Sequence, residues 1–361
     1  MAEKYNFADD LTAKVFKYGP LDVGMDPQPW MMPPHLIKIA MVMFPDDPIA
    51  QVGWVLEEFN RLVLEAIHGI VGVIKPQIAF YEEFGAVGLK AFTATVKLAK
   101  EMGFTVIEDA KRIDGGPTAT AYIDGHLGKV PIFTGGVDQN GRAILGSMVG
   151  PMRVDCMTVA GGYIGPTFVD QFLKITEEYG TGGFFVTKTS FEPPSEIELI
   201  RTWEEGKKGP NKEENFGDLV WERQACLLQQ WGEGTEGACG IRRIGPVIGA
   251  TFPEEAAKMR IILPTAVFLI PGYGEQGAGP DEAVVGLRKD GSGGVINSSR
   301  GIISSWCAIN AKTGAKGPYF TDSANFVTSI RRATIDSQRR LILAAQKADK
   351  WPHGMPHVLA A

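Results

Sequence analysis

The sequence predicts an α/β protein in which eight parallel strands close into a (β/α)8 TIM barrel. Short apolar runs alternate along the chain with segments of helical periodicity, and this alternation is typical of a parallel sheet. Eight such runs occur in 361 residues, a normal length for a barrel with insertions. A doubly wound open sheet is the alternative architecture. We expect a single domain over residues 1–361, with the barrel core at about 21–303.

Most of the predicted strands end in a polar residue or a glycine. They are expected at residues 21–26, 71–75, 104–111, 156–161, 183–190, 246–251, 266–271 and 293–297. Helical spacing predicts helices at 48–68, 86–102, 167–179, 219–230 and 253–262. Because a parallel barrel gathers the carboxyl ends of its strands on one rim, these strand ends predict a functional site there.

Three segments lie outside the simple repeat. Residues 128–153 contain Asn140-Gly141 between short apolar runs, which predicts an inserted β-hairpin with a tight turn. The Lys- and Glu-rich stretch 201–217 predicts a surface loop. Residues 304–361 form an expected C-terminal extension, in which the spacing over 325–350 predicts an extra helix on the outside of the barrel.

Composition restricts the classes of function. The net charge of −6 disfavours nucleic acid as the main partner. No apolar run approaches the roughly 18 residues of a membrane helix, and the N-terminus lacks a signal-peptide pattern, so we expect a cytoplasmic protein. Four cysteines without a C-x-x-C pair fit a reducing compartment. The five histidines lack metal-binding spacing, and we predict no metal site.

The segment Asp109-Ala-Lys111-Arg-Ile-Asp114 closes the third predicted strand and carries the strongest chemical signal. Residues two apart in a strand face the same side, so Asp109 and Lys111 are expected to lie together. A lysine between carboxylates stays protonated and is aimed by them, so it can protonate a carbon or stabilise a carbanion. Lys75 ends the neighbouring strand and would complete a Lys–Asp–Lys–Asp array. A surface ion pair at a strand end is the alternative.

The segment Pro271-Gly-Tyr-Gly-Glu-Gln-Gly277 follows the seventh predicted strand and formally contains G-x-G-x-x-G. A dinucleotide fingerprint would be followed by an acidic residue at the next strand end, but that strand ends in Asn297-Ser-Ser-Arg300. Barrels often bind phosphate between strands seven and eight, and Arg300 supplies a charged fork for phosphate oxygens. The segment therefore predicts a phosphate site, with two tight turns beside a surface arginine as the alternative.

Taken in order, these blocks resemble the orotidine 5′-phosphate decarboxylase family, in particular its longer bacterial-type subgroup. The resemblance runs from about 21 to 303, over Val23-Gly-Met-Asp-Pro27, Lys75-Pro-Gln77, Asp109-x-Lys-Arg-x-Asp114 with Thr118, Thr189-Ser190, Val247-Ile-Gly-Ala-Thr251, Pro271-Gly-Tyr-Gly-x-Gln-Gly277 and Asn297-Ser-Ser-Arg-Gly-Ile302. It implies decarboxylation of orotidine 5′-monophosphate (OMP) to UMP and carbon dioxide without a cofactor, the last step of de novo pyrimidine nucleotide synthesis.

The resemblance also implies roles for residues near the pyrimidine and ribose. Lys111 would donate a proton to pyrimidine C6, and Asp109 would lie against the departing carboxylate. Asp26 and Lys75 would hold ribose hydroxyls. Ser190 would contact the pyrimidine edge, and the lack of a G-x-S-x-G elbow separately disfavours a nucleophilic serine.

Further roles concern the phosphate and a second subunit. Gln276, Gly277 and Arg300, with backbone around Ser299, would bind the 5′-phosphate. Asp114 and Thr118 would reach into the site of a partner subunit, which implies a homodimer with shared active sites.

Two other functions remain open at this point. The first is another barrel enzyme with D-x-K-x-x-D that acts on a sugar phosphate, and loss of activity with a chelator would favour it. The second is a non-catalytic nucleotide-binding protein on the same barrel. UMP binding without turnover would favour that function.

Overall fold

A closed parallel barrel forms the centre of the molecule. The computed structural model describes residues 5–161, 165–191, 196–208, 214–309, 316–317 and 323–359. β1 pairs with both β2 and β12, which closes the sheet, so the barrel prediction is confirmed and the open-sheet alternative is wrong. The eight barrel strands are β1 (Leu21–Met25), β2 (Val73–Pro76), β3 (Thr105–Arg112), β6 (Cys156–Val159), β7 (Gly182–Lys188), β10 (Ile244–Ile248), β11 (Phe268–Ile270) and β12 (Gly294–Ser298).

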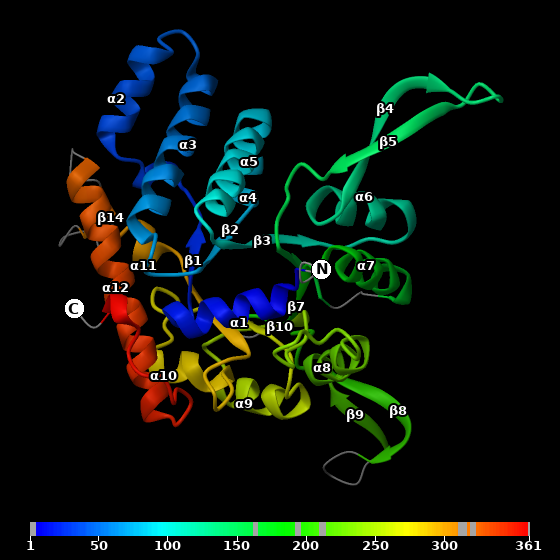
Figure 1. Ribbon diagram of the computed structural model, residues 1–361. Helices are drawn as coiled ribbons and strands as arrows, with labels where there is room; N and C mark the ends of the chain where they lie inside the picture. Colours follow the sequence, from blue (N-terminus) through cyan, green and yellow to red (C-terminus); the bar gives the residue numbers. More distant parts are fainter. Residues whose placement is uncertain are drawn as a thin grey trace.

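Helices surround this barrel (Figure 1). The five helices predicted over 48–68, 86–102, 167–179, 219–230 and 253–262 are confirmed as α3, α5, α7, α8 and α9, each within one residue of its expected bounds. The sequence reading missed α1, although Asn6 accepts hydrogen bonds from the backbone of Ala8 and Asp9 and is a recognisable N-cap. The α-helices are α1 (Phe7–Tyr18), α2 (Pro34–Met43), α3 (Pro48–Ile67), α4 (Ala79–Glu82), α5 (Gly85–Glu101), α6 (Gly116–His126), α7 (Pro166–Tyr179), α8 (Val220–Trp231), α9 (Pro253–Ile262), α10 (Pro280–Ala283), α11 (Arg300–Ile303) and α12 (Ser323–Lys347).

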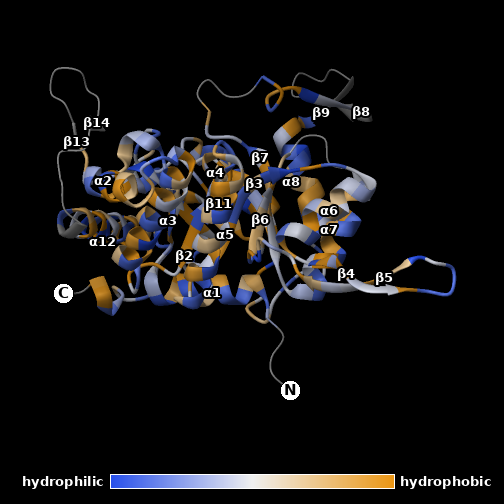
Figure 2. Cartoon of the chain, turned by 90° about the horizontal axis from the view of Figure 1, so that it is seen from above, coloured by the Kyte–Doolittle hydropathy of each residue, from blue (hydrophilic) through white to orange (hydrophobic). Residues whose placement is uncertain are grey.

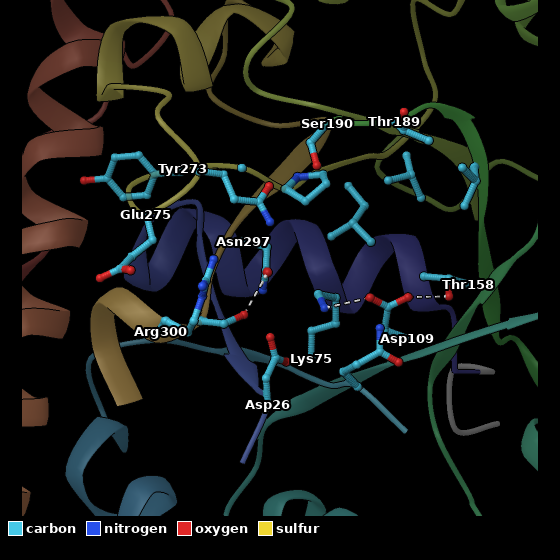
Figure 3. A pocket seen from close by; sticks show the side chains of 18 of the residues that line it. Asp26, Lys75, Asp109, Thr158, Thr189, Ser190, Tyr273, Glu275, Asn297 and Arg300 are labelled. Atoms are coloured by element: carbon cyan, nitrogen blue, oxygen red, sulfur yellow. Dashed lines mark hydrogen bonds and ion pairs between the residues drawn. The ribbon is translucent and has the colours of Figure 1, made fainter. Parts of the chain in front are cut away.

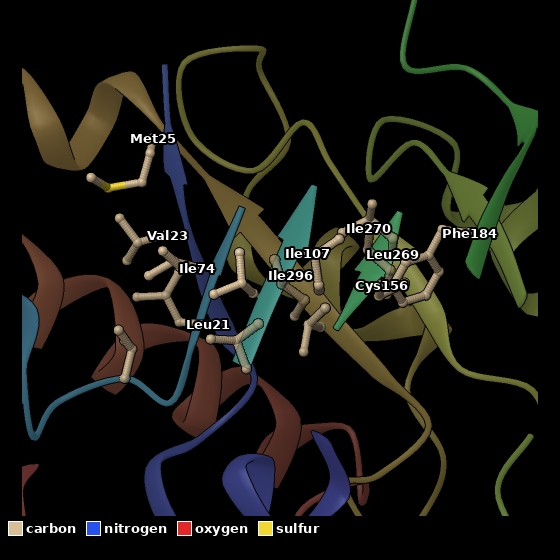
Figure 4. Close-up of a cluster of buried hydrophobic side chains, with 14 of the residues drawn as sticks. Leu21, Val23, Met25, Ile74, Ile107, Cys156, Phe184, Leu269, Ile270 and Ile296 are labelled. Carbon is tan, nitrogen blue, oxygen red and sulfur yellow. The ribbon is translucent and has the colours of Figure 1, made fainter. Parts of the chain in front are cut away.

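The barrel strands are buried on both faces, and β1 shows how their residues divide. Side chains alternate along a strand, so Leu21, Val23 and Met25 share one face. They belong to the continuous apolar core, which Figure 4 shows beside β1 together with Ile74 of β2. Asp22 lies on the other face, so the strand places a polar group in the barrel interior.

The predicted hairpin within residues 128–153 is confirmed. β4 (Lys129–Val137) and β5 (Ala143–Val149) pair antiparallel, and Asp138 accepts hydrogen bonds from the backbone of Asn140 and Arg142 in the turn. Figure 2 shows this hairpin extending beyond the helices, with a hydrophilic tip. Its exposed apolar side chains are Ile132, Phe133, Val137, Ile144, Leu145, Met148 and Val149.

The predicted surface loop at 201–217 is wrong, because a second hairpin forms there. β8 (Arg201–Lys208) and β9 (Glu214–Leu219) pair antiparallel. Thr202 also donates a hydrogen bond from its hydroxyl to the carbonyl of Asp218 at 2.9 Å. Charged residues are compatible with a two-stranded ribbon, since neither of its faces has to be covered. A short antiparallel pair, β13 (Ala308–Ile309) and β14 (Lys316–Gly317), follows the last barrel strand.

The helix predicted over 325–350 is confirmed as α12, which packs outside the barrel against α3, α10, α11 and β1. Its buried Gln338 accepts a hydrogen bond from the backbone N–H of Leu21 at 2.9 Å. The organisation into one domain with a C-terminal extension stays a prediction. No helix in the described ranges is both long enough and apolar enough to cross a membrane.

Candidate active site

A cavity of about 260 Å³ lies at the carboxyl ends of the barrel strands. Its walls come from loops that follow the strands, and Figure 3 shows the polar side chains converging on it. The structure brings together eight of the predicted site residues here: Asp26, Lys75, Asp109, Lys111, Ser190, Gln276, Ser299 and Arg300.

Asp109 is the centre of the charged group. Its Oδ2 accepts a hydrogen bond from Lys75 Nζ at 3.0 Å, and its Oδ1 accepts one from Lys111 Nζ at 2.5 Å. Burial alone would raise the pKa of Asp109, but the two lysines outweigh burial and hold that pKa well below its usual value. Lys75 is 4% exposed, and its pKa is raised because nearby carboxylates, with Asp109 first among them, outweigh desolvation. The Lys75–Asp109 pair is therefore ionised.

Thr158 on β6 fixes the geometry of this pair. Its hydroxyl donates to Asp109 Oδ1 at 2.8 Å and accepts from the backbone N–H of Lys111 at 2.9 Å. Lys111 has a φ of +48°, a left-handed conformation that is uncommon outside glycine. The pairing register of β3 and β6 also shifts after Glu108. Asp109 and Lys111 thus meet as predicted, but an irregular strand end brings them together rather than simple alternation.

Asp26 closes the floor of the cavity beside Lys75. Burial raises the pKa of Asp26, while Lys75 and a hydrogen bond from Ser299 act in the opposite direction. Ser299 reaches this position because residue 24 is glycine. A Cβ atom at Gly24 would lie 1.9 Å from the hydroxyl oxygen of Ser299, a distance that real side chains do not show. Gly24 therefore leaves room beside β1 for Ser299, the residue that follows β12.

Ser190 is held by an anchored segment after β7. Glu198 accepts hydrogen bonds from the buried Lys188 Nζ at 3.0 Å and from the backbone N–H of Thr189 at 2.7 Å. These two contacts tie the strand end to a point eight residues beyond Ser190. Ser190 therefore enters the cavity from a fixed backbone.

The opposite end of the cavity carries the predicted phosphate residues. Figure 3 shows Arg300 with Glu275 and Tyr273, well away from Thr158. Gln276 lines the cavity near Gly272 and Ser190, and Gly277 follows it in a turn in which the N–H of Gly277 donates to the carbonyl of Gly274 at 2.9 Å. The two ends of the cavity thus differ in chemistry, since one holds the lysine–aspartate pair and the other an arginine and a glycine-rich turn.

Asp114 and Thr118 lie outside this cavity. Both are exposed, and Asp114 Oδ1 accepts a hydrogen bond from the backbone N–H of Gly115 at 2.6 Å. The structure of one chain therefore does not bring either residue to its own Lys75–Asp109–Lys111 group.

Sequence reasoning missed several residues of the cavity wall. Gln77, Tyr273 and Asn297 stand in the motifs that carry the resemblance and could have been proposed, whereas Thr158 has no distinguishing signal. Within the described ranges, no three His, Cys, Asp or Glu side chains are grouped to hold a metal ion. The expected independence from metal and cofactor stays a prediction.

Known proteins share both the sequence and the fold of this chain. The sequence model of the orotidine 5′-phosphate decarboxylase / HUMPS family matches residues 23–136. The orotidine 5′-phosphate decarboxylase of Clostridium novyi is 32% identical over 82% of this chain and 88% of its own length. That of Rhodopirellula baltica is 28% identical over 93% and 98%.

A crystal structure from Streptomyces avermitilis, provisionally named orotidine 5′-phosphate decarboxylase, superposes with a TM-score of 0.63 and 25% identity. It covers 94% of this chain and 97% of its own. The barrel, the motifs on its rim and the similarity over most of the chain agree. The chain belongs to the orotidine 5′-phosphate decarboxylase family.

Proposed function

We propose that this protein decarboxylates OMP to UMP and carbon dioxide, with Lys111 as the proton donor. The observation that carries this proposal is the buried Lys75–Asp109 pair with Lys111 beside it, in a cavity whose other end holds Arg300. This spacing of charges suits a nucleotide monophosphate whose carboxylate enters at one end and whose phosphate enters at the other. OMP is the substrate and UMP the product.

The chemistry follows from the charge that develops at C6. The bond between C6 and the carboxylate breaks, its electron pair remains on C6, and carbon dioxide leaves. Lys111 then forms the new C6–H bond with a proton from its ammonium group, which solvent restores. A cation beside the developing negative charge binds the transition state more strongly than the substrate, so it lowers the barrier. Asp109 aims Lys111 and lies against the departing carboxylate.

Binding energy from the rest of the nucleotide opposes the repulsion between Asp109 and the substrate carboxylate. Arg300 and Gln276 bind the phosphate, together with the backbone around Gly277 and Ser299. Asp26 and Lys75 hold the ribose hydroxyls, and Ser190 contacts the pyrimidine edge. Such remote contacts can position the carboxylate against a like charge at the reacting centre.

The test is the ultraviolet absorbance of OMP mixed with the purified protein in the presence of a chelator. Conversion to UMP without added metal is expected. Conversion that stops with chelator would favour a metal-dependent enzyme of the same barrel type. UMP binding without any turnover would overturn the proposal in favour of a non-catalytic protein.

Arg300→Ala is expected to raise KM for OMP by about 10- to 100-fold and to change kcat less. The arginine is exposed and outside the barrel core, so its loss removes hydrogen bonds to a charged group, worth roughly 1.5–3 kcal/mol, without unfolding the protein. Steady-state kinetics measure the effect. Arg332→Ala, which removes an exposed arginine on α12, is the matched control and should leave KM unchanged. An unchanged KM in Arg300→Ala would contradict the phosphate role.

We further propose that two copies form a homodimer with shared sites, in which Asp114 and Thr118 act in the cavity of the partner. Two observations support this proposal. Both residues are exposed and lie outside the cavity of their own chain. The hairpin β4–β5 begins just after α6 and exposes large apolar side chains, among them Phe133 at 85%. Apolar surface of this kind marks interaction sites.

Mixing two inactive variants tests the shared site. Lys111→Ala and Asp114→Ala together should recover about a quarter of the parental activity, because half of the dimers are mixed and each mixed dimer has one intact site. A mixture of Lys111→Ala and Lys75→Ala is the control. Each site takes both Lys75 and Lys111 from the same chain, so every site of a mixed dimer lacks one of these two lysines. No recovery in the first mixture would contradict sharing.

A further inference from the structure

Asp22 is a fully buried carboxyl group beneath the site, and the proposed mechanism does not use it. It is 0% exposed and lies on β1, on the interior face of the barrel. Its Oδ2 accepts a hydrogen bond from Asn297 Nδ2 on β12 at 3.1 Å. Its Oδ1 is buried and has no hydrogen-bond partner. In a fully buried position, an ionised carboxylate with one oxygen that accepts no hydrogen bond is unfavourable, whereas a protonated carboxyl group costs less free energy.

Charged and titratable groups surround Asp22 from β1, β2, β3 and β6, whereas β12 contributes the uncharged Asn297. Lys75 approaches from β2 and Asp109 from β3, Asp26 lies further along β1, and the Cys156 thiol faces it from β6. The carboxyl groups of Asp22, Asp26 and Asp109 therefore share Lys75. Burial raises the pKa of Asp22 to about 7, although Lys75 and the hydrogen bond from Asn297 act in the opposite direction.

We propose that Asp22 is a positioning residue for the decarboxylation, one that acts through Lys75 and carries a proton in the active enzyme. When Asp22 is neutral, Lys75 interacts mainly with Asp109 and with the substrate. When Asp22 ionises, a third negative charge lies below the site, competes for Lys75 and weakens binding of the anionic nucleotide. The activity is then lost as the pH rises through the ionisation of Asp22. This inference rests on the proposed function.

Asp22→Asn tests the inference, because asparagine keeps the shape of a protonated aspartate and can still accept from Asn297. The ratio of kcat/KM for the variant to that of the parent should rise about tenfold between about pH 6 and about pH 8. Glu108→Gln is the matched control. Glu108 is also a buried carboxyl on a barrel strand with one unpaired oxygen, but its other oxygen bonds His126, and its substitution should leave the pH profile unmoved. A ratio that stays flat with pH would overturn the role of Asp22.

Stability provides a second readout that needs no activity. The folded protein holds the Asp22 proton between the ordinary aspartate pKa and the raised one, so its contribution to stability falls as the pH rises through that window. Asp22→Asn should therefore gain Tm relative to the parent as the pH increases from about 5 to about 8. An unchanged difference would also overturn the inference.

An infrared spectrum of the folded parent decides the case in which Asp22→Asn does not fold. We expect a carboxylic-acid band that disappears as the pH approaches neutrality. The same band should be missing from the spectrum of a second variant, Asp22→Ser. If the parent lacks activity on OMP while this band is present, the proposed function is wrong, but the protonation of Asp22 is supported. If the parent is active and the band is missing, only the inference fails.

Discussion

Lys111→Ala is expected to lower kcat by at least about 10³-fold while UMP binding stays within a few-fold of the parent. Lys111 supplies both the proton for C6 and the cation beside the developing charge, so its loss removes two contributions to the same step. The side chain is 48% exposed, and the barrel core does not depend on it. Single-turnover assays of OMP conversion and calorimetric titration with UMP would separate the two effects.

Lys90→Ala is the matched control for this variant, since Lys90 is 78% exposed on α5 and makes only a surface ion pair with Glu57. It should retain parental kcat. Turnover of Lys111→Ala within a few-fold of the parent would rule out Lys111 as the proton donor. Loss of UMP binding together with turnover would indicate instead that Lys111 holds the nucleotide.

Asp109→Asn is expected to reduce kcat/KM by about 10³-fold or more and also to destabilise the fold. The change leaves Lys75 buried without its closest anion, and breaking a buried pair costs about 3–5 kcal/mol. Asp26 remains near Lys75, so we expect the lower end of that range. Urea unfolding at neutral pH measures the loss.

The destabilisation has a defined dependence on pH. Because the pKa of Asp109 is held below its unfolded value, its contribution is present above the unfolded pKa and is lost as the pH falls through the folded one. The difference in unfolding free energy between parent and Asp109→Asn should therefore shrink in acid.

Asp155→Asn is the matched control for Asp109→Asn. Asp155 is also buried and paired, accepting from Lys100 Nζ at 2.7 Å and from the backbone of Val106 at 2.9 Å, but it does not line the cavity. It should lose stability while keeping parental kcat. Equal losses of kcat in the two variants would mean that Asp109 acts only through the fold.

Much of the architecture could be read from the sequence, because periodicity reports directly on which faces are buried. Helix α9 begins after Phe252 with Pro253 and two acidic residues, and both of its bounds were predicted. The hairpin β4–β5 was recognised by Asn140-Gly141, a local signal for a tight turn. By contrast, the composition of the charged stretch 201–217 predicts a loop, because the pairing of β8 with β9 depends on backbone hydrogen bonds that composition does not encode.

The site divides in the same way. Lys75, Asp109 and Lys111 stand at the ends of two neighbouring strands, so the barrel predicts that they lie on the same rim. The sequence around Thr158 contains no comparable signal, because the role of Thr158 depends on the left-handed backbone at Lys111 and on the register between β3 and β6. In the sequence, Asp22 is a single polar residue within an apolar strand. Only the closed barrel shows that its side chain lies near Lys75 and Asn297.

The closure of the barrel by β1 has a consequence for how the chain acquires its structure. Leu21 pairs with Ile296 and donates its N–H to Gln338, a partner 317 positions later in the sequence. Contacts of such separation form slowly, because a long loop must close before they stabilise anything. A nascent chain holding only the first barrel strands therefore leaves β1 with one free edge. Asp26 can contact Ser299 only after synthesis has passed β12, so the wall of the cavity beside Asp26 is completed late.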